Sequence, residues 1–449
     1  MEHPQPGGMP PSRRMPPPGR GPGTGVRAAL RSPPFATLLA GYACSAIGDG
    51  MAAVAISWLA IELSRGRDTG LLVGASVAAY TVPGVVAGLG LGRVLTRWDP
   101  RLLVLAEAAL RAVSLGLVAA GAATRLLTPA WYVALLGVSS LLGLLGVTGA
   151  VASVAELLPE AQRVAGNSLI TLTSFAATII GPGLAGLVIA TAGADVAFGA
   201  DALSYLVLVV AVLISRRVRR PPPPAGPGQG MHRALRDLAR RPSVFGITVT
   251  CAVFYGLYGP VEVALPVYVA RVLHAGAGVL GGYWTLFGCG ATVGALGASW
   301  IQRLGLWRVT VAVIAGWGIC LIPLGVTDSA AVGFAALAAG GLVYGPFQPI
   351  KQTIIQRHSP PGQLAAMAAA SGLLTVPAAP LGTALGGPLV AAIGPSATLL
   401  ASGLATVALA GIAAAVLLVR RAATSRPPGP RRSSPPPPPT SAEPSTRPP

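Results

Sequence analysis

The sequence predicts an all-α polytopic membrane protein with twelve transmembrane helices in two pseudo-symmetric six-helix bundles. Composition is the first reason: 53% of the 449 residues are hydrophobic and only 10% are charged, whereas soluble domains carry about 25% charged residues. The mean hydropathy of +0.66 agrees with a membrane protein. The other two reasons are the number of long apolar runs and a repeat between the two halves of the chain.

Twelve apolar runs are long enough to cross a bilayer, which takes about 20 residues per helix. Six runs lie in the first half, at 35–62, 70–92, 102–124, 131–157, 167–191 and 196–215. Six more lie in the second half, at 244–269, 278–300, 309–327, 331–354, 364–389 and 396–419. The equal division favours two bundles of the same size.

A polar loop followed by a glycine-rich apolar run occurs once in each half, at 158–189 and at 359–387. One offset of 201 positions aligns four residues of the two copies: Pro159 with Pro360, Gly181 with Gly382, Gly186 with Gly387 and Gly193 with Gly394. The alignment fails at Pro182, whose counterpart is Thr383. Related halves are typical of transporters, and the mismatch predicts that the two halves do not gate alike.

Basic residues indicate how the chain crosses the membrane. With the N-terminus inside, the cytoplasmic segments hold 27 of the 32 Lys and Arg residues and the outer loops hold four. This asymmetry follows the positive-inside rule, so we expect a cell-membrane protein with both termini in the cytoplasm. Topology also accounts for the net charge of +18. We expect no nucleic-acid partner, because no basic stretch is interleaved with aromatic residues.

The apolar runs divide the chain into five parts. We expect a disordered cytoplasmic tail, a first bundle, a cytoplasmic linker, a second bundle and a disordered Pro-rich tail, at 1–30, 31–215, 216–243, 244–420 and 421–449 respectively. Within the linker, Met231, Leu235 and Leu238 share one helical face that arginines flank. This pattern favours an amphipathic helix on the membrane surface, with a solvated linker as the alternative.

Ionisable residues within the apolar runs are the candidates for function, because a charge at membrane depth costs about 2.5–3.5 kcal/mol. Asp49 lies midway along the first run. It could bind and release a proton as a cavity alternates, or accept structural hydrogen bonds. Glu262 follows Gly259 and Pro260 midway along the seventh run, the counterpart of the first. It is a second candidate for binding a proton or a cationic substrate.

Two other ionisable features have simpler interpretations. Glu107 and Arg111 are four positions apart on the third run, so they share one helical face. We expect a structural ion pair near the cytoplasmic end of that helix. Asp201 is expected to cap the start of the sixth helix near the outer surface.

Six aromatic residues form a hypothetical lining for a drug cavity: Trp58, Tyr80, Tyr255, Tyr258, Trp284 and Phe287. Taken singly, each is equally compatible with packing or with anchoring at the membrane interface.

The sequence predicts no metal site and no cofactor. The four cysteines and four histidines are scattered, without metal-ligand spacing. A phosphate loop requires lysine before Ser or Thr, but the single lysine, Lys351, precedes Gln352. The chain therefore holds no ATPase motif of its own, and no cluster of catalytic residues suggests a membrane-embedded enzyme.

Four segments together resemble the major facilitator superfamily, and in particular its macrolide-efflux and siderophore-exporter branch. They are Gly48-Asp49-Gly50, the loop from Gly92 to Arg101, the loop at 158–168 with the glycine-proline helix after it, and Gly345-Pro346-Phe347. The resemblance covers about residues 35–420. It implies two bundles around a cavity that opens alternately to each side, and export of small amphiphilic molecules driven by protons.

The resemblance also implies a role for the loop after the second helix. In the family this loop carries a glycine, an aspartate and basic residues, and the aspartate helps to lock one conformation. Gly92, Arg97 and Arg101 match, but Thr96 stands at the aspartate position. The lock is therefore expected to be weaker, unless the nearby Asp99 substitutes.

The fifth helix resembles the antiporter motif of the family through Gly181, Pro182, Gly183 and Gly186. That motif implies a bend that controls leakage and conformational exchange, and close helix packing is compatible with it. We therefore expect a monomeric secondary exporter of drugs, macrolides, siderophores or secondary metabolites, with protons as the coupling ion. An importer or facilitator of the same fold is the alternative, because residues alone do not set direction.

Overall fold

A computed structural model of the protein describes residues 25–64, 66–95, 99–215, 230–359 and 363–424. All regular structure within these ranges is helical, which confirms the predicted all-α class. The N-terminal half contains α1 (Val26–Leu30), α2 (Pro33–Leu63), α3 (Thr69–Leu95), α4 (Pro100–Ala123), α5 (Pro129–Ser140), α6 (Gly143–Leu157), α7 (Glu160–Ala192) and α8 (Ala194–Ile214). A 3₁₀ turn at Gly66–Asp68 precedes α3.

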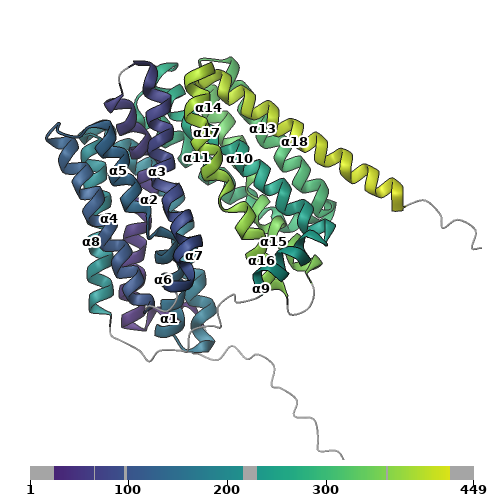
Figure 1. The fold of residues 1–449 in the computed structure, drawn as a ribbon, viewed down its shortest axis with the longest axis horizontal. Coiled ribbons are helices and arrows are strands. Elements are labelled where there is room, and N and C mark those ends of the chain that lie inside the picture. The colour runs from purple at the N-terminus through teal and green to yellow at the C-terminus, as the bar shows by residue number, and fades with distance from the viewer. Residues whose placement is uncertain (1–24, 65, 96–98, 216–229, 360–362, 425–449) are drawn as a thin grey trace, which may run out of the picture.

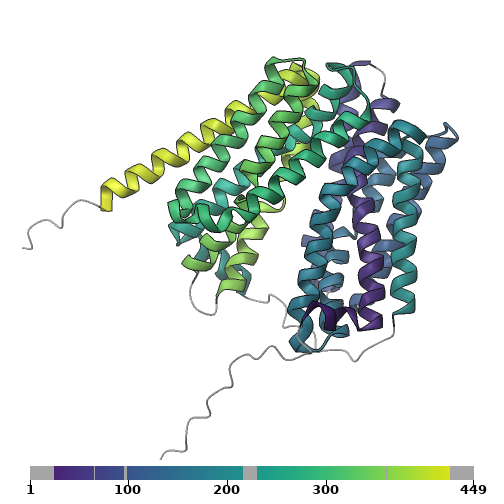
Figure 2. The same ribbon diagram turned by 180° about the vertical axis from the view of Figure 1, so that it is seen from behind.

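The C-terminal half begins with the linker helix α9 (Gly230–Ala239). It continues with α10 (Pro242–Arg271), α11 (Ala277–Leu296), α12 (Ala298–Ile301), α13 (Leu306–Val326), α14 (Ala330–Tyr344), α15 (Phe347–His358), α16 (Leu364–Thr375), α17 (Ala378–Ile393) and α18 (Pro395–Thr424), with a 3₁₀ turn at Gln302–Leu304. Figures 1 and 2 show the two halves as separate helical bundles standing side by side.

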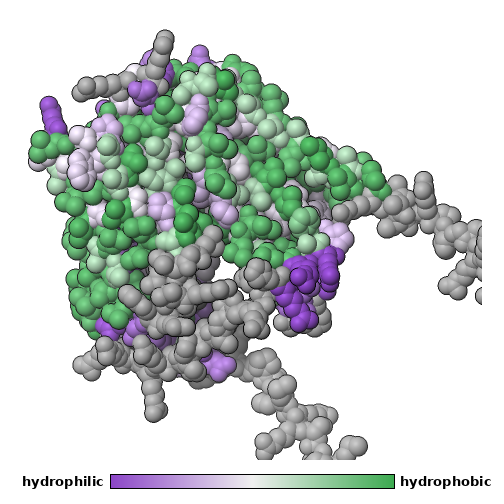
Figure 3. Space-filling model, in the orientation of Figure 1, coloured by the Kyte–Doolittle hydropathy of each residue, from purple (hydrophilic) through white to green (hydrophobic). Residues whose placement is uncertain are grey.

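Eleven stretches of the described residues are long and apolar enough to span a membrane. The twelfth expected run, 131–157, is divided between α5 and α6 at Leu141 and Leu142, so neither piece is long enough alone. Both pieces pack against α3 and α4, and together they take the place of one spanning helix. Figure 3 agrees with a multi-pass membrane protein, because hydrophobic residues cover most of the visible helical surface.

The internal repeat corresponds to two equivalent helix crossings. At the crossing of α2 and α7, a Cβ atom on Gly181 would lie 2.5 Å from the Cα of Gly50. At the crossing of α10 and α17, a Cβ on Gly259 would lie 2.7 Å from the carbonyl oxygen of Ala379 and would also meet the backbone of Gly382. Gly181 and Gly382 are the residues that the 201-residue offset aligns. The two bundles are therefore built on the same close contact.

Substituting Gly181 by valine is expected to destabilise the N-terminal bundle by about 1–3 kcal/mol, because α2 and α7 would have to separate to admit the side chain. Thermal unfolding of the purified protein, followed by size-exclusion chromatography after heating, measures the effect. Gly372→Val is the matched control, since no atom lies within 4 Å of a Cβ placed there. Equal melting temperatures for the two variants would contradict the prediction.

The two bundles meet at the end that lies away from the linker. A Cβ on Gly186 of α7 would lie 3.2 Å from the Cα of Gly281 in α11, and a Cβ on Gly74 of α3 would lie 2.6 Å from the Cα of Gly387 in α17. Toward the end where α1 and α9 lie, which we call the linker end, the ribbons of the two halves diverge (Figures 1 and 2). The contacts between the bundles therefore gather at the opposite end.

The linker helix packs against protein. Leu238 is buried and Leu235 is half-buried, and α9 contacts α10 and α16. The arginines at 233, 236 and 240 are exposed, so the expected amphipathic pattern is present, with its leucine face occupied by the C-terminal bundle. The side chain of Met231 and the rest of the linker before α9 lie outside the described residues. So do most of both tails, although Val26–Leu30, expected to be disordered, forms α1.

Candidate functional site

A guanidinium at the centre of the N-terminal bundle joins four helices. Arg111 projects from α4, and its Nη1 lies 2.6 Å from Oδ1 of Asp49 on α2. The same nitrogen donates to the hydroxyl oxygens of Tyr80 on α3 at 2.6 Å and of Tyr205 on α8 at 2.8 Å. Charge-assisted hydrogen bonds of this kind are stronger than neutral ones, so Arg111 ties the bundle together around one carboxylate.

Asp49 is the most exposed member of this network. Its Oδ1 accepts hydrogen bonds from the hydroxyls of Tyr80 at 2.8 Å and Tyr205 at 2.6 Å, besides the contact with Arg111. The Asp49 side chain is 45% exposed, whereas that of Arg111 is 11% exposed. A proton or a ligand from the open side therefore meets the aspartate before the arginine.

The glycines on either side of Asp49 hold it in place. Gly48 faces α8, where a Cβ atom would collide with the side chains of Asp201 and Ser204. Gly50 faces α7 at the crossing with Gly181. Because both neighbours lack side chains, α2 fits closely between α7 and α8 and directs Asp49 toward α3 and α4.

Glu107 completes the network on the side away from solvent. Its Oε1 lies 2.7 Å from Nε of Arg111, an ion-pair contact in which the N–H is not aligned for a hydrogen bond. The expected pair is present, but it is neither self-contained nor at a helix end, because Asp49 shares the same guanidinium. Gly143 and Gly146 of α6 admit the pair: a Cβ on either would lie 2.8 Å from the Arg111 or Glu107 side chain, respectively.

The expectation for Asp201 was wrong. Helix α8 begins at Ala194, so Asp201 lies two turns inside the helix and is only 1% exposed. Sequence reasoning also missed Tyr205, one turn further along the same face. The spacing of four between Asp201 and Tyr205 in an otherwise apolar helix was the signal that could have identified both.

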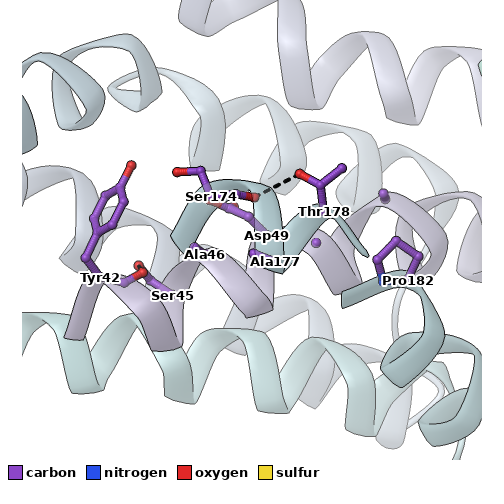
Figure 4. A pocket seen from close by; sticks show the side chains of 10 residues that line it. Tyr42, Ser45, Ala46, Asp49, Ser174, Ala177, Thr178 and Pro182 are labelled. Carbon is purple, nitrogen blue, oxygen red and sulfur yellow. Dashed lines mark hydrogen bonds between the residues drawn. The ribbon is translucent and has the colours of Figure 1, made fainter. Parts of the chain in front are cut away.

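Asp49 opens into a cavity of about 300 Å³ between α2 and α7. The lining is small and partly polar: Tyr42, Ser45, Ala46, Asp49, Gly50, Ala53, Ser174, Ala177, Thr178 and Pro182. Figure 4 shows the labelled side chains of α2 and α7 around this space, with Thr178 donating to the carbonyl oxygen of Ser174 at 3.0 Å. Small side chains and hydroxyls beside one carboxylate make a site suited to a compact polar or cationic group.

The other carboxylate candidate lies in the C-terminal bundle. Glu262 of α10 is half-buried, and its Oε2 accepts a hydrogen bond from Oγ1 of Thr383 on α17 at 2.9 Å. Thr383 is the residue that replaces the proline in the repeat. At this position the first bundle has Pro182, which lines the cavity, and the second has Thr383, which donates a hydrogen bond to the half-buried Glu262. The two halves therefore differ here.

The aromatic candidates fall into two groups. Four of them belong to an aromatic cluster of the C-terminal bundle: Tyr255 and Tyr258 on α10, and Trp284 and Phe287 on α11. Two of its ring-centroid distances are 6.4 Å for Tyr258–Trp284 and 5.9 Å for Trp284–Phe287. Sequence reasoning missed other members of this cluster, namely Phe254, Trp317, Tyr344 and Phe347. Tyr80 belongs to the Arg111 network, and Trp58 packs against the hydrophobic core.

The loop after α3 is only partly described. Thr96 and Arg97 lie outside the described residues, and Gly92 is described only as part of α3. Asp99 caps α4, accepting a hydrogen bond from the backbone N–H of Arg101 at 3.0 Å. The Arg101 guanidinium donates to the carbonyl oxygens of Val212 through Nε at 2.9 Å and of Leu213 through Nη2 at 3.0 Å, at the end of α8.

The glycine-proline motif of α7 contacts both bundles. Gly181 meets α2, Pro182 lines the cavity, and Gly183 and Gly186 face α11, where a Cβ on Gly183 would lie 2.8 Å from Oγ1 of Thr285. The helix is continuous from Glu160 to Ala192 despite the proline. This segment therefore joins the cavity wall to the interface between the bundles.

Two helical bundles with eleven stretches of membrane-spanning length among the described residues, and an ion-paired carboxylate at a cavity, are typical of a polytopic membrane transporter. Residues 38–379 match the family model of the Major Facilitator Superfamily. That match covers most of the chain, and the protein belongs to this superfamily. The expected fold and family resemblance are both confirmed.

Characterised relatives include efflux pumps. The chain is 28% identical over 387 residues to the multidrug efflux pump Tap of Mycolicibacterium fortuitum, covering 82% of this chain and 91% of that protein. It is 29% identical over 402 residues to Tap of Mycobacterium bovis strain BCG, covering 84% and 92%. It also matches an uncharacterized MFS-type transporter, y4rN of Sinorhizobium fredii, at 27% identity, over 56% of this chain and 63% of that one.

Solved transporters share the fold. The nucleoside transporter NupG superposes with a TM-score of 0.69 at 12% identity, covering 86% of this chain and 99% of its own. The POT family transporter PepTSo gives the same TM-score and identity, with 88% and 99% covered. The family and these relatives indicate a transporter and not an enzyme.

Proposed function

We propose that this protein is a secondary active exporter of a small amphiphilic molecule, coupled to protons through Asp49. One observation carries the proposal: the carboxylate paired with Arg111 is also the charged residue that lines the cavity. Asp49 pairs with the Arg111 guanidinium and also faces the cavity. It can therefore couple proton transfer to substrate binding, because a proton and a substrate compete for the same carboxylate.

The competition has a direct electrostatic basis. A proton on Asp49 removes the charge that holds Nη1 of Arg111, and the guanidinium keeps its contact with Glu107. A cationic or hydrogen-bonding group of a substrate would likewise compete with Arg111 for Oδ1. Binding of one partner therefore weakens binding of the other, which is the requirement for antiport by alternating access.

The distribution of charge supports one orientation of the chain in the membrane. The linker end carries α9 with its exposed arginines, and basic residues favour the cytoplasmic side. We therefore place the linker end, toward which the bundles diverge, in the cytoplasm, together with both termini. With the bundles apart on that side, substrate can enter from the cytoplasm. Export as the direction is supported by the relatives named as multidrug efflux pumps.

The substrate class follows from the two linings. The cavity in the N-terminal bundle offers hydroxyls and a carboxylate. The aromatic cluster of the C-terminal bundle offers half-buried rings, among them Tyr258, which interacts electrostatically with Glu262. An amphiphilic molecule satisfies both, and the relatives named as multidrug efflux pumps support that class. Both linings come from one chain, so we propose that a monomer suffices.

Purified protein in liposomes with an imposed pH gradient tests the proposal. Ethidium, tetraphenylphosphonium and erythromycin serve as amphiphilic probes, with protein-free liposomes as the control. We expect at least one probe to accumulate against its gradient and a protonophore to stop the accumulation. Downhill movement that the protonophore leaves unchanged would instead identify a facilitator.

A further inference from the structure

A second aspartate, Asp201, is buried next to the Asp49 network. Asp201 on α8 is 1% exposed, and its Oδ1 lies against Gly48, the neighbour of Asp49. Its contacts are slight: Ser204 Oγ is 3.5 Å from Oδ1, and Oδ2 is buried without a hydrogen-bond partner in the described part of the chain. An ionised carboxylate in that position would be among the most costly groups a membrane protein can contain.

The charges around Asp201 do not balance if every carboxyl is ionised. Asp201 interacts electrostatically with Asp49, Glu107 and Arg111, and also with Tyr80. That makes three carboxyl groups for one guanidinium. The other described charges on α8 and on the helices packed against it lie toward helix ends, at Glu62, Arg101, Glu160, Arg163 and Asp195.

Arg111 is already committed to two of the three carboxyls. Its Nη1 contacts Asp49 and its Nε contacts Glu107, and Asp201 makes no ion pair with any residue that the structure describes. The remaining negative charge of the site can therefore be neutralised only by protons. Asp201 is the least exposed of the three carboxyls and has the fewest partners, so it is the one that keeps a proton at the lowest cost in free energy. The bare Oδ2 is the position where that proton fits.

We propose that Asp201 is a second proton-binding site of the transport cycle, occupied while Asp49 is paired with Arg111. The proposal deepens the proton coupling of Asp49 and rests on it. When Asp49 takes up a proton from the open side, Arg111 becomes available to Asp201. Asp201 can then ionise, and its proton leaves to the water on the side that the cavity faces after the bundles rearrange. A second proton, taken up from the opposite side when Arg111 pairs with Asp49 again, returns Asp201 to its protonated form and closes the cycle.

Infrared spectroscopy detects the bound proton without any substrate. A protonated carboxylic acid has a C=O stretching band that carboxylates and amides lack, so the purified protein at neutral pH should show this band. Asp201→Asn should lose one component of it. Asp195→Asn, a change of the same kind at the start of the same helix, should keep the band unchanged. A spectrum of Asp201→Asn identical to the wild type would overturn the proposal.

Carbon-13 labelling gives the same information from the wild-type protein if Asp201→Asn fails to fold. Labelling aspartate but not glutamate should shift the band, because the heavier carbon lowers the C=O stretching frequency of a protonated aspartate. A band from Glu107 or Glu262 would not move, since both stay unlabelled. An unshifted band would assign the proton to a glutamate and overturn the proposal.

Transport separates this inference from the function on which it rests. With ethidium in proteoliposomes, protons taken up per ethidium released should fall by about one in Asp201→Asn, because one titrating carboxyl is gone. An unchanged ratio alongside a lost band would overturn the role of Asp201 in the cycle. If wild-type protein shows the band but no proton-driven transport, the coupling through Asp49 fails while the proton on Asp201 stands.

Discussion

Asp49→Asn is expected to reduce proton-driven transport to the level of protein-free liposomes while leaving folding and membrane insertion intact. Asparagine has almost the same shape, so its side-chain oxygen can still accept from Tyr80, Tyr205 and Arg111. It cannot bind a proton at neutral pH. The network therefore keeps its geometry and loses the exchange of a proton for substrate. Efflux of a transported probe under an imposed pH gradient measures the effect.

The matched control is Asp68→Asn, which changes an exposed aspartate in the turn before α3. It should transport as the wild type does. Chromatographic profile and melting temperature check that Asp49→Asn is folded. Full proton-driven efflux by a folded Asp49→Asn protein would exclude the coupling role of Asp49.

Arg111→Gln should have the largest effect on stability, a loss of about 3–5 kcal/mol, because removing one partner leaves a buried charge uncompensated. Glu107 is nearly sealed and has Arg111 as its ion-pair partner. Asp49 and the two tyrosines lose their common donor in the same substitution. The expected results are a low yield of monodisperse protein and a lower melting temperature than for Arg125→Gln, an exposed control outside the bundle.

A double substitution tests the cause. Glu107→Gln combined with Arg111→Gln removes both buried charges, so it should recover part of the stability that Arg111→Gln loses. Arg111→Lys keeps the positive charge but should still transport less than the wild type. A lysine ammonium cannot contact Asp49 and Glu107 at once, as the two nitrogens of the planar Arg111 guanidinium do. If the double variant is no more stable than Arg111→Gln, the uncompensated charge on Glu107 is not the cause.

The repeat shows how far sequence reasoning reached. The offset that aligns Gly181 with Gly382 identified two halves correctly, because glycine is needed wherever two helix backbones touch and this need leaves a visible spacing. It did not reveal the partners. Gly181 meets Gly50 in its own bundle, whereas Gly186, on the same helix, meets Gly281 in the other. Both contacts look alike in sequence.

For Asp49 and Arg111, the spacing within the sequence pointed to the wrong set of partners. Each was visible as a charge in an apolar run, yet Arg111 was assigned to Glu107 alone because the two are four residues apart on one helix. The contact with Asp49 spans 62 positions and the contact with Tyr205 spans 94. Periodicity describes neighbours within a helix, and it carries no information about which helix stands opposite.

The amino-acid sequence by itself determined the membrane location, the all-helical class, the two related halves and the candidate charges. Those properties follow from the cost of exposing polar groups to lipid, and that cost acts on each segment separately. Only the tertiary structure decided that Asp49 and Glu107 share one arginine with Asp201 buried beside them. It also decided that glycines at 48, 143 and 146 make room for these side chains, and that Thr383 donates to Glu262 where the other half has Pro182. These relations depend on how helices pack, because a guanidinium pairs with whichever carboxylate the fold brings within reach.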